Sequence, residues 1–80
     1  MTPVTVVRAL TLYLYNVSPV EIVIDVYGED IHPDYATEKI HSFSKRSFAS
    51  FFGGLDSQHQ ERLVEAAMKR YGDEAERRQA

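Results

Sequence analysis

The 80-residue chain contains no cysteine, and it has only four glycines and three prolines. Without cysteine it can form neither a disulfide nor a thiolate metal site, so no such cross-link adds to the stability of its small core. A chain of this length buries only roughly 60–65% of its unfolded surface, which leaves a small stability margin. Small domains of this kind often self-associate, and we expect the same of this chain.

Long apolar runs are also missing. No stretch approaches the ~20 apolar residues that cross a bilayer. The first apolar run is interrupted by Arg8 and is not preceded by a basic segment, which is not typical of a secretory signal. We therefore expect a cytoplasmic protein that does not enter a membrane.

A basic excess is absent as well, since the formal net charge is −3. Nucleic-acid-binding domains usually carry a basic excess on one face. Here charges balance over residues 32–80, and the acidic excess lies in the first third of the chain. That third sets one cation, Arg8, against four carboxylates: Glu21, Asp25, Glu29 and Asp30.

Two capping patterns predict helices near the N-terminus. Thr2 precedes Pro3, and Ser18-Pro19-Val20-Glu21 has the spacing of a capping box with proline at the first helical position. Gly28 follows where a helix would end in a left-handed residue. These signals favour helices over strands in this part of the chain.

The alternating pattern of the same residues leaves a second interpretation open. Apolar and polar side chains also alternate there, as they do in half-buried strands. The favoured prediction is helices over 3–15 and 19–27. The alternative is an α+β fold in which 4–15 and 20–27 form a hairpin against the remaining helices.

The centre of the chain holds all four phenylalanines and predicts one long helix over 33–52, ended by Gly53-Gly54. Ser44 and Ser47 compete for backbone hydrogen bonds, so the helix could kink or break there. Four apolar side chains fall within one arc at about 100° per residue and form the predicted inward stripe: Ala36, Ile40, Phe43 and Phe51.

The last helix has the most regular pattern. Apolar residues recur at i, i+3 and i+4 and predict a helix over 57–71, capped by Asp56 or Ser57 and ended by Gly72. The predicted fold is therefore all-α, a small four-helix domain. It comprises helices at about 3–15, 19–27, 33–52 and 57–71 in a single domain, 1–72, followed by a frayed charged tail, 73–80.

Residues for catalysis or metal binding are sparse. There is no Gly-x-Ser-x-Gly motif and no glycine-rich phosphate loop, and the three histidines are scattered. Glu38-x-x-His41 has the spacing of di-iron bundles, but such a site needs carboxylates from other helices as well. We interpret Asp34, Glu38 and His41 as a solvated polar face. We therefore expect no enzymatic activity, no cofactor, no metal and no small-molecule substrate.

Five tyrosines and four phenylalanines are many large side chains for four short helices to enclose. The surplus favours a non-enzymatic protein–protein interaction or regulatory module, most simply a two-fold homodimer. Phe48 and Phe52 lie outside the inward stripe, on the flank of the long helix. The predicted interface centres on this pair, with Lys45, Arg46 and His41 at its polar rim.

Two alternatives stay open. A kink at residues 44–47 would turn Phe48 and Phe52 into the monomer core. The chain could also be a nucleic-acid-binding transcriptional regulator of helix-turn-helix type, with Gly28 in the turn and Lys45 and Arg46 near phosphate. The balanced charge argues against that second alternative.

Overall fold

The computed structural model describes residues 2–45 and 48–77, except for the side chains of residues 44–49. This part of the chain is 84% helical, with five helices and no strand. The all-α fold class is therefore confirmed, and the alternative hairpin is wrong. The helices are α1 (Pro3–Asn16), α2 (Pro19–Tyr27), α3 (Pro33–Lys45), α4 (Phe48–Gly53) and α5 (Ser57–Arg77).

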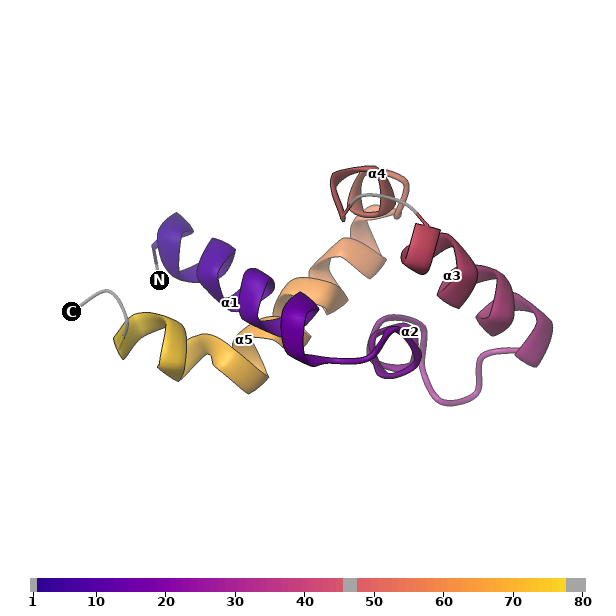
Figure 1. Cartoon of the computed structure of the whole chain (residues 1–80), viewed down its shortest axis with the longest axis horizontal. Helices are drawn as coiled ribbons and strands as arrows, with labels where there is room; N and C mark the ends of the chain where they lie inside the picture. Colours follow the sequence, from indigo (N-terminus) through magenta and orange to yellow (C-terminus); the bar gives the residue numbers. More distant parts are fainter. Residues whose placement is uncertain (1, 46–47, 78–80) are drawn as a thin grey trace.

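α1 and α5 lie side by side and run in opposite directions, so the start of α1 and the end of α5 lie at the same end of the molecule (Figure 1). α2 packs against α5, and α3 packs in turn against α2 and α4, on the far side of α2 from α5. The molecule is elongated, with extents of 43 × 23 × 22 Å.

The predicted helix starts are confirmed in their hydrogen bonding. The Thr2 hydroxyl accepts a hydrogen bond from the Thr5 amide at 3.2 Å. The Ser18 hydroxyl accepts one from the Glu21 amide at 3.3 Å. Each bond satisfies an amide that has no partner inside its own helix. At its other end α2 stops at Gly28, whose φ is +100°.

Small side chains form the core where α1 meets α5. They let the two helices approach closely, since the distance between helix axes depends on the side chains at the contact. Larger buried side chains come from α2 and from the two facing helices. The small buried residues are Thr5 and Ala9 on α1 and Ala67, Gly72 and Ala75 on α5. The largest fully buried side chains are Tyr13, Ile22, Leu63, Val23 and Val26.

The prediction of one helix over 33–52 is wrong. α3 ends at Lys45 and α4 begins at Phe48. The sequence places a possible break at residues 44–47, where serine hydroxyls can compete for backbone hydrogen bonds. Arg46 and Ser47 themselves lie outside the described residues.

Packing between Phe43 and Phe51 accompanies this break. Their rings meet edge to face, with centroids 4.7 Å apart and planes at 88°. In a continuous helix, eight residues would separate the two positions by ~12 Å along the axis. The contact therefore fits a chain that turns between the two helices. It lies within the predicted inward stripe, of which Phe51 is buried and Phe43 half-buried.

The predicted end of the last helix at Gly72 is also wrong, because α5 continues to Arg77. Gly72 is buried inside the helix, and Ala75 is fully buried in the core. We attribute the continuation of α5 beyond Gly72 to its packing against α1. Helix thus replaces the predicted frayed tail over 73–77, and residues 78–80 lie outside the described part of the chain.

Gly28→Ala should lower the free energy of unfolding by about 1–3 kcal/mol, measured by urea denaturation. Gly28 has φ 100° and ψ 159°, a combination that is essentially confined to glycine. A Cβ atom there would also lie 3.0 Å from the Asp30 Oδ1 atom.

Gly53→Ala is the matched control. A Cβ atom on Gly53 meets nothing within 4 Å, and alanine is the better helix former. Its stability should be unchanged or slightly raised. Equal losses in the two variants would contradict the special role of Gly28.

Candidate functional site

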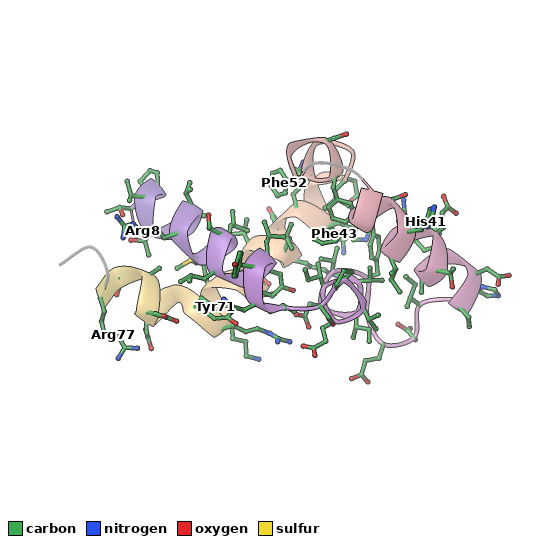
Figure 2. The ribbon with its side chains drawn as sticks, in the orientation of Figure 1. Arg8, His41, Phe43, Phe52, Tyr71 and Arg77 are labelled. Carbon is green, nitrogen blue, oxygen red and sulfur yellow. The ribbon has the colours of Figure 1, made fainter. Side chains whose placement is uncertain are left out.

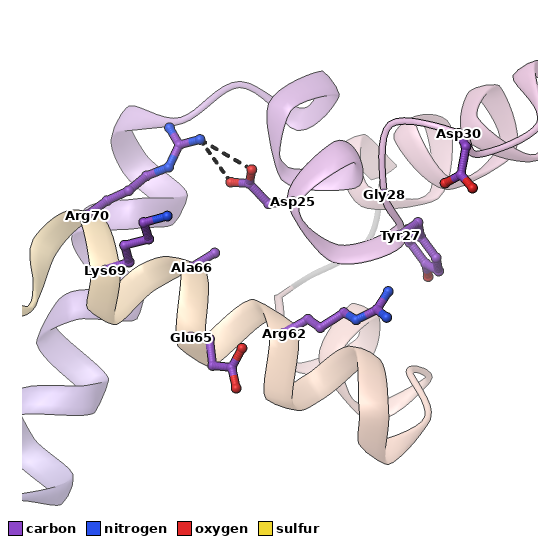
Figure 3. Close-up of a pocket in the computed structure, with 9 residues that line it drawn as sticks. All are labelled: Asp25, Tyr27, Gly28, Asp30, Arg62, Glu65, Ala66, Lys69 and Arg70. Atoms are coloured by element: carbon purple, nitrogen blue, oxygen red, sulfur yellow. Dashed lines mark hydrogen bonds and ion pairs between the residues drawn. The ribbon is translucent and has the colours of Figure 1, made fainter.

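A wide groove of about 980 Å³ runs between the C-terminal end of α2 and the facing side of α5 (Figure 3). Its lining mixes both signs of charge and includes Tyr27, Gly28 and Ala66. The charged residues are Asp25, Asp30 and Glu65 on the acidic side and Arg62, Lys69 and Arg70 on the basic side.

Arg70 closes one end of the groove by joining α5 to α2. Its guanidinium lies 3.0 Å from the Asp25 Oδ2 atom and 3.2 Å from the Glu21 Oε2 atom. The hydrogen bond to Glu21, followed by the charge of Asp25, raises the pKa of Arg70 above its ordinary value. Arg70 is thus engaged in contacts within the protein.

Tyr13 extends this contact into the core. Its side chain is fully buried, and its hydroxyl donates a 2.6 Å hydrogen bond to the Asp25 Oδ2 atom. The Arg70 guanidinium lies 5.9 Å from the centroid of the Tyr13 ring. Burial, and then the hydrogen bond to Asp25, raises the pKa of Tyr13 far above its ordinary value. Tyr13, Asp25 and Arg70 therefore connect α1, α2 and α5.

Arg62 has a similar internal role further along α5. Its guanidinium donates a 3.2 Å hydrogen bond to the Val26 carbonyl in the last turn of α2. A cation at the C-terminal end of a helix satisfies a carbonyl that lacks a helical partner and complements the helix dipole. Two of the three cations of the groove thus hold α2 against α5.

Tyr27 borders the groove and an aromatic cluster behind it. Its ring contacts Tyr35 edge to face at 5.5 Å and His59 at 4.4 Å, measured between centroids. Burial raises the pKa of Tyr27 to about 12, with contributions from Tyr35 and Asp56. Tyr27 therefore keeps its proton at neutral pH. The groove offers charged groups and a protonated phenol, which suit polar recognition.

The residues of the predicted interface lie on separate helices. His41 is exposed on α3, whereas Phe52 is half-buried on α4 and packs against the core (Figure 2). The interface prediction assumed one continuous helix, whereas α3 ends at Lys45 and α4 begins at Phe48. The side chains of Lys45, Arg46 and Phe48 lie outside the described residues, so the interface stays a prediction.

Phe52 also lines a second depression, of about 400 Å³, between α4 and α5. We call it the α4–α5 hollow. Its remaining lining comes from the first half of α5: Ser57, Gln60, Glu61, Val64 and Glu65.

The outward face of α1 is a surface that the sequence analysis did not single out. Val4, Val7, Thr11 and Tyr15 fall within about 80° of one another around the helix; we call them the α1 strip. Val4 is 54% exposed, Val7 61% and Tyr15 88%. A signal was present in the sequence, because α1 is apolar on every side and carries a single charge, Arg8.

The other candidate site residues of the sequence analysis, Asp34, Glu38 and His41, lie on α3. Glu38 and His41 are exposed, and the described residues contain no group of three side chains able to hold a metal ion. On α3, the Lys39 ammonium lies 5.0 Å from the centroid of the Tyr35 ring. Asp34 on the same helix is exposed, so this helix does not form a purely cationic face for nucleic acid.

No protein-family model, curated protein or solved structure matches this chain. In the described part of the chain, no helix is both long enough and apolar enough to cross a membrane.

Tyr13→Phe should lower the free energy of unfolding by about 1.5–3 kcal/mol, because it removes a buried hydrogen bond to a carboxylate. Tyr15→Phe is the matched control, since Tyr15 is 88% exposed. Its effect should stay within about 0.5 kcal/mol. Urea denaturation of both variants measures the difference, and equal effects would contradict a structural role for the Tyr13 hydroxyl.

Stability should also fall as the pH rises above about 10, the ordinary pKa of tyrosine. The pKa values of Tyr13 and Tyr27 are raised in the folded protein, so the unfolded chain loses these protons first. Their contribution is complete below pH ~10 and is lost above it. Urea denaturation across this range should show a shallower fall for Tyr27→Phe than for the wild type. Parallel curves would contradict the assignment to Tyr27.

Proposed function

We propose that this protein is a small non-enzymatic interaction module that self-associates through the α1 strip. The observation that supports this is the exposure of Val4, Val7 and Tyr15 on one face of a single helix. Isolated exposed apolar residues are common on protein surfaces, but aligned ones mark interaction sites.

The energetics favour association. Burying one valine or one similar side chain stabilises by about 1.5–3 kcal/mol relative to leaving it in water. An 80-residue domain has a net stability of only about 5–15 kcal/mol, so the burial of several such side chains is a large free energy in comparison. Covering them in a complex recovers the part of that free energy that belongs to their exposed surface, against the entropic cost of association.

The geometry suits a two-fold contact between two copies. From Val4 to Tyr15 the strip covers ~16 Å of helix. If two strips pack antiparallel, Val4 of each copy lies near Tyr15 of the other. Such a contact is isologous and closes as a dimer. A single-helix contact is smaller than the ~800 Å² per partner of standard interfaces, so the dimer should be weak and concentration-dependent.

The interface predicted on Phe48 and Phe52 is a separate candidate for the same function. Phe52 already packs against the core, which leaves less of its surface for a partner than Tyr15 has. We therefore place the contact on α1.

Val7→Asp tests this proposal. It puts a charge in the middle of the strip, and because Val7 is exposed the monomer should keep its helical circular dichroism. Light scattering from micromolar to millimolar concentration should show a wild type whose mass rises toward that of a dimer. The Val7→Asp variant should remain at the mass of a monomer.

Val20→Asp is the control, because Val20 is similarly exposed, at 51%, but lies on α2. It should associate as the wild type does. A wild type that stays monomeric throughout would end the proposal. Dissociation by Val20→Asp and not by Val7→Asp would move the contact to α2.

A further inference from the structure

The α4–α5 hollow lies on a different part of the molecule from the α1 strip, so a partner could bind there whether or not the chain self-associates. Its apolar floor is formed by Phe52 on α4 and Val64 on α5, both half-buried. An apolar depression between two helices can accept the apolar side chains of a partner helix.

A hydrogen bond joins α4 and α5, the two helices that form the hollow. The Gln60 Nε2 atom donates a 2.7 Å hydrogen bond to the Phe52 carbonyl near the end of α4. This bond fastens α4 to the first turns of α5. The depression is therefore preformed, and a partner would not have to order it on binding.

The rim of the hollow is acidic. Glu61 and Glu65 lie one turn apart on α5, and both are exposed. Like charges at this spacing destabilise a helix. Neither carboxylate forms an ion pair with a cation of the described residues. A cationic partner would reduce the repulsion between these two carboxylates.

We propose that the α4–α5 hollow docks a basic amphipathic helix of a partner protein. The apolar face of that helix would enter the hollow over Phe52 and Val64. Lysine or arginine residues one turn apart would face Glu61 and Glu65. The α1 strip of a second copy fits less well, because α1 carries only one cation, Arg8, for the two carboxylates.

A synthetic helical peptide is a direct probe. It carries leucines at i, i+3, i+4 and i+7 on one face and lysines one turn apart on either side. Fluorescence anisotropy should show binding to the full chain that weakens with added salt, because rim charges are screened. A peptide of the same composition in scrambled order is the matched control, and it should bind much more weakly because it lacks the apolar face.

Two double variants locate the site. Glu61→Gln with Glu65→Gln removes the rim charges without changing side-chain size, and should weaken binding about fivefold. Asp73→Asn with Glu76→Gln removes the same charge from exposed positions elsewhere on α5 and should leave binding unchanged.

Four outcomes would overturn the proposal. The first is that the peptide does not bind. The second is equal binding of the scrambled peptide, and the third is equal weakening by the two double variants; either would indicate nonspecific attraction to an acidic protein. The fourth is binding that neither double variant changes, which would place the peptide on another surface.

Discussion

The packing of α1 along α5 is the contact on which the rest of this structure depends. Both helices present small buried side chains where they meet, which include Ala9, Ala67 and Ala75. Because α1 covers the second half of α5, that helix continues through Gly72, which alone would favour its end. The same contact covers only one side of α1. The opposite side stays exposed with Val4, Val7 and Tyr15 beside the polar Arg8 and Thr11, and it is the surface on which we propose self-association.

Polar contacts between helices add to the packing of the small core. Tyr13, Asp25 and Arg70 link three helices at a point where each group has a partner. Among the described residues, no buried side-chain nitrogen or oxygen lacks a hydrogen-bond partner. The groove between α2 and α5 is therefore charged for a structural reason, since Arg62 and Arg70 serve to hold α2 in place. The proposed contacts therefore centre on other surfaces, and only Glu65 lines both the groove and the α4–α5 hollow.

The two proposed contacts differ in their physical character. The α1 strip is apolar, with one neighbouring cation, so its association depends mainly on removing valine and tyrosine from water. The α4–α5 hollow combines an apolar floor with two carboxylates. A partner there would be selected by charge as well as by shape. A module with both surfaces could bring copies of itself together while holding a different protein.

The sequence by itself determined the fold class and the starts of α1, α2, α3 and α5, because these depend on groups within four residues of one another. Thr2 and Ser18 each accept a hydrogen bond from an amide three residues on, and Gly28 ends α2 through its own backbone conformation. What depends on distant partners was decided by the tertiary structure alone. The Phe43–Phe51 contact, the extension of α5 beyond Gly72 and the exposed face of α1 all belong to this second group. A helix that is apolar all round does not reveal which side it will bury, because the answer lies in the shape of the helix packed against it.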